Sequence, residues 1–450
     1  MLNGRFLKYI KKTLSVITLS AVLCGVLTAC DDEVTEAQKF ADYGTYGSDF
    51  ARELASEYPY RKPYSDEEYE AGLMIKKEFE SLGYQVVSQP VSTENGTSYN
   101  YFVKIDGMGF IETSEDDTYT GQESEIRRTV IIGAHYDSFF SAEDIPEGYT
   151  YDGISDNASG VGCIMTIAKE IKNYTNLGFD VTIVAFGAGN DNYSGARTFF
   201  NTLSAAERES IEVMYCIENI YAGDKVYASA GMNSLNISHK YEMRRKLYQA
   251  YDVAYNDTLS ALNGFNLYYN ECGILTDLNG DGTEDVYREV TVNKSDYCIF
   301  DDAGIPIVFF DSGDYFFDEM SKMKETKNLN LQEFGGIISG TYLDSCDVLD
   351  PILITVEKVE TEVTLPSVTE SGSEIVIAES VEPSTSIVTE SVIKDQLEIR
   401  INNIAYVIME SMMKGSDDGI THEQYEFILA NPTPIPEPSD TSTVATVRIG

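Results

Sequence analysis

Apolar and polar positions alternate along the chain in two ways. Short apolar runs, typical of buried strands, occupy residues 128–138, 179–188, 211–220 and 304–310. Residues 157–174 instead carry apolar side chains at helical spacing. Strands that alternate with helices favour a largely parallel sheet covered on both faces. The sequence therefore predicts an α/β fold with a mixed, largely parallel central sheet sandwiched by helices.

The amino-acid composition changes after about residue 354. Residues 355–395 are rich in Ser, Thr, Glu and Val, which predicts a flexible insertion or linker. Residues 396–415 return to helical spacing and are expected to form a last helix that packs on the domain. Residues 416–450 end in a Pro- and Thr-rich stretch and are expected to be a disordered tail. The main domain is then residues 49–354.

The first thirty residues read as a targeting segment. Four basic side chains precede the apolar run TLSVITLSAVLCGVL, an order typical of a secretory signal. The run ends in LTAC, which resembles a bacterial lipobox. We expect cleavage before Cys30, attachment of lipid to its thiol, and anchoring of the secreted protein to the outer face of a bacterial membrane. Residues 31–48 would be a polar leader. An ordinary cleaved signal, with Cys30 as a bystander, is the alternative.

The charge balance narrows the classes of partner. The 450 residues include 32 Lys and Arg against 74 Asp and Glu, a net charge of -42. Nucleic acids and anionic lipid surfaces both require clustered cations, so neither is expected as a partner. The five cysteines beyond Cys30 are odd in number and widely spaced, which argues against a disulfide framework. A bond between Cys272 and Cys298 stays open.

Candidate chemistry begins where the first buried strand ends. His135 and Asp137 leave that strand, and Asp156 stands just before the helix that follows. An imidazole and carboxylates at strand ends are ligands suited to zinc. Asp137 is expected to accept a hydrogen bond from the imidazole and fix its tautomer. A single histidine near aspartates is more often structural, so the wider pattern has to decide.

The wider pattern resembles a known family. GAHYDS, SDNASGVG, a strand that ends in FGA, and SDYCIFDDAGIPIVFF follow one another in this order. Over roughly residues 45–350 the chain resembles the zinc-dependent exopeptidases of metallopeptidase family twenty-eight, the aminopeptidase-like group. The resemblance implies a mixed eight-stranded sheet with two zinc ions at strand ends. One zinc would be held by a His, a bridging Asp and a second Asp, and the other by the bridging Asp, a Glu and a His.

The first zinc site is retained when these positions are carried over. The resemblance assigns it to His135, to Asp156 as the bridging carboxylate, and to Glu218, which stands where the family has an Asp. The family's cis peptide bond would follow Asp156. These residues imply a single zinc site.

The second site and the general base are lost. The family's Glu-Glu pair, which supplies the base and a zinc ligand, is replaced by Gly189 and Asn190. The family's last His falls at Leu343. Loss of a positioned base alone typically lowers the rate ~10²–10⁴-fold. We therefore expect little or no peptidase activity, and a non-catalytic role in binding a peptide or protein, or as a scaffold. The alternatives are an active exopeptidase with a rearranged site and a structural module with a vestigial cleft.

A second motif concerns calcium. Asp277, Asn279, Asp281 and Asp285 match positions one, three, five and nine of a calcium loop, but Arg288 replaces the bidentate Glu at position twelve. A bound Ca²⁺ and an ordinary turn between strands both remain open.

Overall fold

The computed structural model describes most of the chain from residue 40 onward. The described residues are 40–112, 125–140, 145–235, 240–271, 275–277, 282–315, 322–365, 368–371, 374–377 and 384–430. They belong to one unit, Phe40–Gly450. The predicted signal and Cys30 lie outside them. None of the helices within these ranges has the length and apolar character needed to cross a membrane.

An eight-stranded sheet forms the centre of the fold, in the order β1-β2-β6-β5-β7-β12-β8-β9. Strands β5, β6, β7 and β12 run parallel to their neighbours within this group, and the outer pairs β1/β2, β2/β6 and β8/β12 are antiparallel. The predicted mixed, largely parallel α/β class is thus confirmed. The strand bounds are Val87–Thr93 (β1), Gly96–Ile105 (β2), Thr129–His135 (β5), Asp180–Phe186 (β6), Ile211–Ile217 (β7), Lys225–Ser229 (β8), Leu267–Tyr268 (β9) and Ile307–Gly313 (β12).

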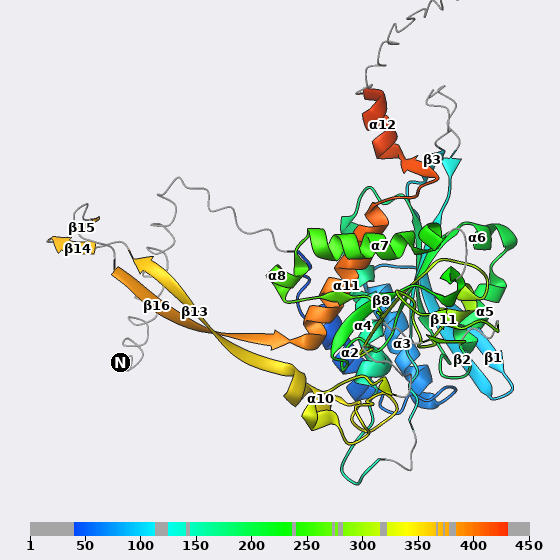
Figure 1. Cartoon of the computed structure of the whole chain (residues 1–450), viewed down its shortest axis with the longest axis horizontal. Helices are drawn as coiled ribbons and strands as arrows, with labels where there is room; N and C mark the ends of the chain where they lie inside the picture. Colours follow the sequence, from blue (N-terminus) through cyan, green and yellow to red (C-terminus); the bar gives the residue numbers. More distant parts are fainter. Residues whose placement is uncertain are drawn as a thin grey trace, which may run out of the picture. The chain divides into compact units, whose positions relative to one another are not determined.

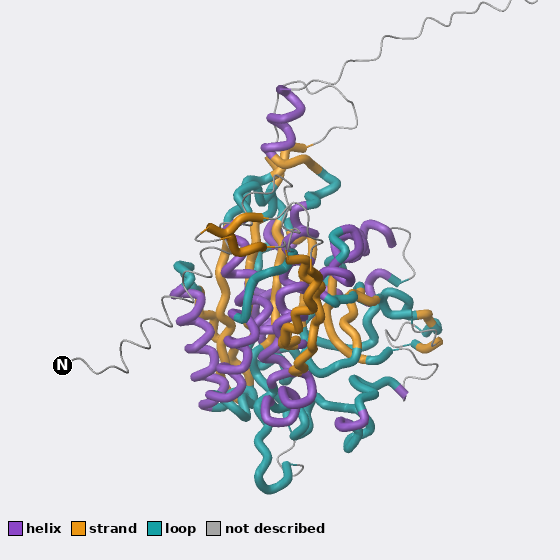
Figure 2. The backbone as a smooth tube through the Cα atoms, turned by 90° about the vertical axis from the view of Figure 1, so that its left-hand side faces the viewer, coloured by secondary structure: helices purple, strands orange, loops and turns teal. Residues whose placement is uncertain are grey.

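Helices cover both faces of this sheet (Figure 2). Alternate side chains of β5 point to opposite faces, so that Ile132 joins one apolar cluster and Ile131 the other. One face is packed by α2 (Tyr46–Glu57), α3 (Asp66–Ser81), α4 (Ser159–Glu170), α7 (Lys240–Asn256) and α11 (Gln396–Met413), the other by α5 (Ser194–Thr202) and α9 (Cys298–Asp301). The short helices α6 (Ala205–Glu209) and α8 (Leu259–Asn263) complete the set between β6 and β9.

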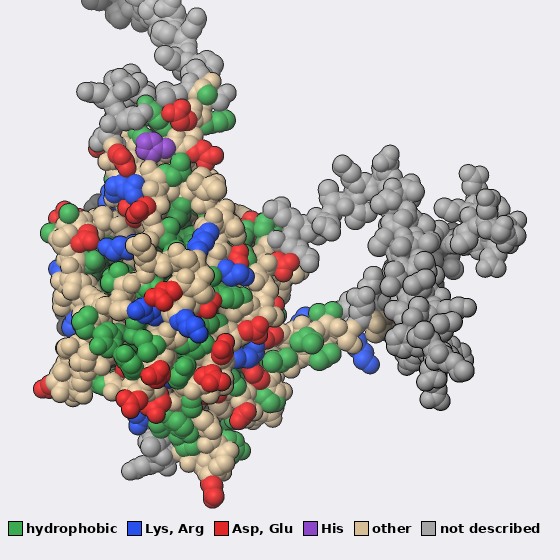
Figure 3. All heavy atoms as spheres, turned by 180° about the vertical axis from the view of Figure 1, so that it is seen from behind, with side chains coloured by type: hydrophobic (Ala, Val, Ile, Leu, Met, Phe, Trp, Pro, Cys, Tyr) green, Lys and Arg blue, Asp and Glu red, His purple; other side chains and the backbone are tan. Residues whose placement is uncertain are grey.

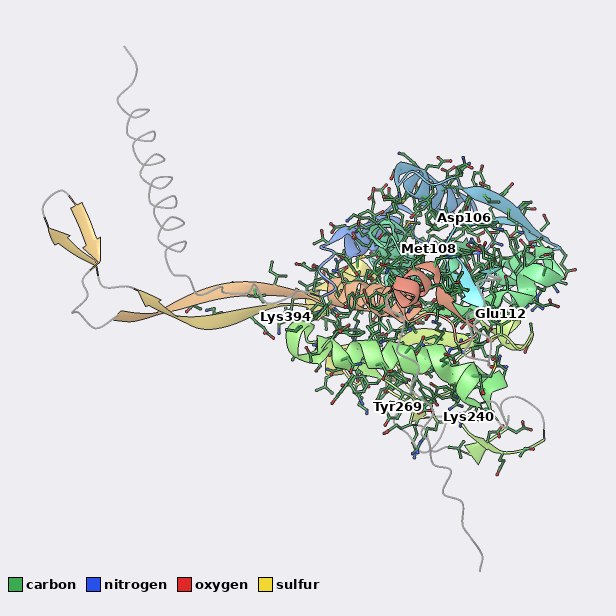
Figure 4. The ribbon with its side chains drawn as sticks, turned by 90° about the horizontal axis from the view of Figure 1, so that it is seen from above. Asp106, Met108, Glu112, Lys240, Tyr269 and Lys394 are labelled. Carbon is green, nitrogen blue, oxygen red and sulfur yellow. The ribbon has the colours of Figure 1, made fainter. Side chains whose placement is uncertain are left out.

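Both predicted ends of the domain need correction. Helix α2 begins within the predicted leader, and Gly47 and Ser48 are already buried, because small side chains there pack closely against α4. The predicted tail contains β17 (Gly419–Thr421) and α12 (His422–Ala430). Strand β17 pairs with β3 (Phe110–Glu112), which also pairs with β4 (Glu125–Ile126). Figure 4 labels Asp106, Met108 and Glu112 along the segment that leads into β3. Residues 431–450 lie outside the description.

The segment 355–395 is an insertion built from paired strands. Strand β13 (Ile354–Leu365) pairs with β16 (Ser384–Asp395), and β14 (Val368–Ser371) pairs with β15 (Glu374–Ile377). The insertion joins α10 (Cys346–Leu353) to α11 (Figure 1). The expected flexible linker is wrong for these strands, because the Val, Ile and Thr residues between the polar ones favour extended pairing.

One arginine holds the two ends of the insertion together. Arg52, on α2, donates to Asp350 at 3.0 Å and to Asp395 at 2.7 Å. Beyond this point, Lys394 pairs with Glu357 across the two strands at 2.7 Å (Figure 4). The insertion therefore leaves and re-enters the domain at one place.

Charged side chains are spread over the surface. Figure 3 shows acidic side chains interspersed with basic and apolar ones on the face that it presents. On this face the acidic side chains do not form a single patch.

Candidate metal centre

Three predicted ligands meet at one end of the sheet. His135 is the last residue of β5, Glu218 directly follows β7, and Asp156 lies just before α4. Because β5 and β7 are parallel neighbours, their carboxyl ends lie side by side. The Nε2 atom of His135 is 3.4 Å from Asp156 Oδ1 and 3.8 Å from Glu218 Oε1. Within the described ranges, these three form the group whose ligand atoms all lie within 4.8 Å of one another.

The geometry and chemistry of this cluster fit zinc. A tetrahedral zinc with bonds of about 2.0–2.1 Å separates its ligand atoms by about 3.3 Å, close to the two distances above. Asp156 Oδ1 and Glu218 Oε2 are buried and have no hydrogen-bond partner in the part of the chain that the structure describes. Burial acts to lower the pKa of His135, but the carboxylates of Asp137, Asp156 and Glu218 outweigh it and raise that pKa. The surroundings of the imidazole therefore favour a positive charge, which a zinc ion would supply in place of the proton.

Asp137 orients the imidazole through its backbone. The Nδ1–H of His135 donates to the carbonyl oxygen of Asp137 at 3.0 Å, whereas the carboxylate of Asp137 lies 3.6 Å away. The predicted bond to the carboxylate is thus replaced by a bond to the carbonyl. The carboxylate turns instead to the loop after β6, where it accepts from the backbone N–H groups of Gly189 (2.6 Å) and Asn190 (2.9 Å). Either acceptor leaves Nε2 free to bind a metal.

The position of the lost general base is closed by the imidazole. A Cβ atom added to Gly189 would lie 2.6 Å from the Cβ atom of His135 and 2.9 Å from its Cγ atom. No side chain fits there unless His135 or the loop that carries Gly189 moves. The sequence showed only that a Glu is missing at Gly189, whereas the structure shows that the space for one is missing too.

The two aligned ligand positions, Asn190 and Leu343, carry neither a carboxylate nor an imidazole. The side-chain amide of Asn190 donates to Asp137 at 2.9 Å. Leu343 is 4% exposed and belongs to the main apolar cluster. At these positions the described chain offers a second zinc no ligand besides the shared Asp156.

Two buried groups that the sequence did not reveal hold the ligand-bearing loops. Arg61 is fully buried and donates to the backbone carbonyls of Tyr136 (2.9 Å), Asp152 (2.6 Å) and Gly153 (3.1 Å). It therefore links the chain beside His135 to the loop that carries Asp156. A lone arginine inside the aromatic stretch YPYRKPY was the available signal.

The second of these groups is Asp344. Its carboxylate accepts from the backbone N–H groups of Ser155 (2.7 Å) and Asp156 (3.1 Å). Burial raises the pKa of Asp344 well above its ordinary value. The peptide bond between Asp156 and Asn157 is cis, as the resemblance implied. Asp344 thus braces the loop immediately before this bond.

A third group, Asp296, lies near the cluster without a partner. It is 1% exposed, and within the described ranges neither of its carboxylate oxygens has a hydrogen-bond partner. Burial, together with the charges of Asp137 and Glu218, raises the pKa of Asp296 to about 7, although His135 acts in the opposite direction. It stands in the SDY stretch of the sequence pattern, where we assigned it no role.

The calcium motif lies on a separate hairpin. Strands β10 (Leu275–Thr276) and β11 (Asp285–Val286) are antiparallel, and Asp277 Oδ2 accepts from the backbone N–H of Gly282 at 2.9 Å. Asn279 and Asp281 lie outside the described residues, so calcium binding stays a prediction. Cys272 also lies outside them, and Cys298 is a free thiol.

The chain is similar in sequence to a known family of peptidases. Residues 117–335, a little under half of the chain, match the family model described as Peptidase family M28. A protein of Escherichia coli (strain K12), the alkaline phosphatase isozyme conversion protein, is 23% identical over 209 residues. That match covers 45% of this chain and 59% of the relative, so the chain spans less than two thirds of it.

Solved structures share the fold at low sequence identity. Fimbriiglobus ruber glutaminyl cyclase matches with a TM-score of 0.50 and 13% identity, over 84% of this chain and 98% of that one. A Zn-dependent exopeptidase from Parabacteroides distasonis matches with a TM-score of 0.48 and 14% identity, over 84% and 99%. The comparisons support a relation to the M28 peptidases.

Proposed function

We propose that this chain is a cell-surface lipoprotein whose M28-like domain binds a peptide or protein at a single zinc centre and does not hydrolyse it. The observation that carries this proposal is the closed space at Gly189. A Cβ atom at position 189, where the family's general base would begin, would overlap the Cβ and Cγ atoms of His135.

The residues of the site have two roles in the proposed binding, holding the metal and positioning the loops that carry its ligands. His135, Asp156 and Glu218 would hold the zinc, which supplies a Lewis acid for a carbonyl or carboxylate group of the ligand. Arg61 and Asp344 keep the ligand-bearing loops in place through hydrogen bonds to backbone groups. Their role is to fix geometry, which binding and catalysis both need.

Asp296 favours a second candidate function, an exopeptidase with a rearranged site. Its unpartnered carboxyl, with a pKa of about 7, is suited to accept a proton near neutral pH. In that case Asp296, which stands in the last segment of the sequence pattern, would serve as the general base in place of the residue missing at position 189. The two functions differ in one measurable property, turnover.

A direct test combines zinc content with turnover of aminoacyl-nitroanilides. We expect one equivalent of zinc, loss of that zinc in Asp156→Asn, and no hydrolysis. Hydrolysis that chelators and Asp296→Asn both abolish would establish the exopeptidase instead. A protein without zinc after dialysis against the metal would leave only a vestigial cleft.

The lipoprotein part of the proposal has its own test. Cys30→Ala should release the protein from the membrane fraction and change its mature mass. An unchanged mass and location would contradict lipidation without affecting the zinc proposal.

A further inference from the structure

A pocket of about 280 Å³ opens beside the metal cluster. Asp156 and Glu218, two of the three proposed ligands, form part of its lining. A group bound to the zinc would therefore have the pocket next to it. Ligand pockets for whole small molecules typically measure about 300–1,000 Å³, so this one has room for a single amino-acid side chain rather than for a longer segment.

The lining of this pocket is apolar and acidic at once. Phe309, Met323 and Ile337 supply apolar surface, while Asp311 and Glu325 supply carboxylates. Zinc and its two carboxylate ligands would be electrically neutral together, because His135 binds a metal in its neutral form. Asp311 and Glu325 would then be the carboxyl groups of the pocket that do not bind the metal.

One oxygen of Asp311 has no hydrogen-bond partner among the described residues. Asp311 is 3% exposed and lies near the end of β12. Asp311 Oδ2 accepts from Asn293 Nδ2 at 2.8 Å and from the hydroxyl of Tyr315. Asp311 Oδ1 is buried and has no hydrogen-bond partner. Burial raises the pKa of Asp311 to about 7, and the charges of Glu218 and Glu325 act in the same direction. The ionised form of a buried carboxyl with an unpartnered oxygen is stabilised by a nearby cation, which a bound ligand could supply.

The lysines at the pocket do not fill this need. Lys294 and Lys324 also line it, and Lys294 is exposed. Among the described residues, neither of them forms an ion pair with Asp311 or Glu325. Glu325 is satisfied differently, since both of its oxygens accept from the backbone N–H of Ser339 at 3.1 and 3.2 Å. Asp311 is therefore the carboxylate with capacity for a ligand.

We propose that this pocket receives the lysine or arginine side chain of a peptide whose backbone lies at the zinc centre. Such a side chain has an apolar stem and a cationic head. The stem would pack against Phe309, Met323 and Ile337. The head would pair with the unpartnered oxygen of Asp311. The inference rests on the proposed zinc-dependent binding and adds the class of residue that is recognised.

The test uses three probes that share one metal-binding group. Lysine hydroxamate, norleucine hydroxamate and glutamate hydroxamate are titrated calorimetrically into the zinc-loaded protein. Lysine and norleucine differ chiefly in the terminal ammonium group. We expect lysine hydroxamate to bind at least about tenfold more tightly than norleucine hydroxamate, the effect of one hydrogen bond to a charged group. Glutamate hydroxamate should bind most weakly.

Variants assign the preference to the pocket. Asp311→Asn keeps the shape of the side chain and should bring the lysine and norleucine affinities together, with zinc content unchanged. Glu325→Gln should reduce the preference in part, and it serves if Asp311→Asn does not fold. The control Asp302→Asn, at an exposed aspartate, should keep the full preference.

The outcomes separate this inference from the proposed function. Equal binding of lysine and norleucine hydroxamates, or a preference that survives both pocket variants, would overturn the basic-residue pocket and leave the zinc site standing. Failure of all three probes to bind the zinc-loaded protein would overturn the proposed binding function itself.

Discussion

Replacing Gly189 by alanine tests the closed base position most directly. The new Cβ atom would lie 2.6 Å from the Cβ atom of His135, whereas ordinary contacts begin near 3.4 Å. The imidazole or the loop must therefore move by roughly 0.8 Å, the difference between these two distances. His135 cannot move freely, because its Nδ1–H is bonded to Asp137 and its backbone belongs to β5.

The expected cost follows from overpacking. Inserting a methyl group into a well-packed site typically costs about 1–3 kcal/mol. If the strain is relieved by displacing His135, zinc affinity should fall about 5- to 150-fold, since about 1.4 kcal/mol corresponds to a factor of ten. The measurement is a zinc titration in competition with a chelating dye, alongside thermal unfolding with and without the metal.

Gly304→Ala is the matched control. Gly304 has a φ of +81° and open space around a built Cβ atom, so alanine there should lower stability through backbone strain alone and leave zinc affinity unchanged. If Gly189→Ala binds zinc as tightly as the parent protein, the imidazole does not close the base position and the central argument against hydrolysis is lost.

Three further predictions concern the framework. Arg61→Met removes the donors of buried carbonyls and should cost about 4 kcal/mol or more, at about 1 kcal/mol or more for each of four hydrogen bonds; zinc affinity should fall as well, and unchanged unfolding would refute the bracing role. Burial lowers the pKa of Lys246 to about 7, so the unfolded chain binds more protons between about pH 7 and 10.5 and stability should rise with pH over this window. Lys246→Met should flatten that rise in urea unfolding, and an unaltered slope would contradict the assignment. Arg52→Ala removes the bonds to Asp350 and Asp395 and should speed proteolysis within 355–395. Equal cleavage rates of the variant and the parent protein would contradict the role of Arg52.

The sheet could be predicted because each central strand is a continuous apolar run, although β5 and β7 end at His135 and Ile217, short of the predicted bounds of 138 and 220. The metal cluster could be located because His135 and Asp156 stand in a short, ordered pattern. Arg61 escaped notice because its role depends on contacts between residues far apart in the chain, and Asp311 because its pocket joins residues from Asp156 to Ser339. Arg61, for example, meets Gly153 across 92 positions. No local spacing encodes such a contact.

The insertion shows a similar limit of composition as a guide. Its many Ser, Thr and Glu residues favour a flexible segment, yet Val and Ile residues interleaved with them are enough to pair β13 with β16. The composition of the segment gave no information on whether or in which register its strands pair. The same applies to α12, which follows β17 in a segment that resembled a tail.

The clamp at Arg52 makes the domain tolerant of changes in chain length at that point. Because Asp350 and Asp395 meet at one guanidinium group, the ends of the insertion stay together whatever lies between them. Loop-closure entropy grows only slowly with length, so the hairpin offers a natural attachment point for a fluorophore, an epitope or a whole reporter domain. Arg52, Asp350 and Asp395 are not among the residues of the metal cluster or of its pocket, so a label in the hairpin would leave both unchanged.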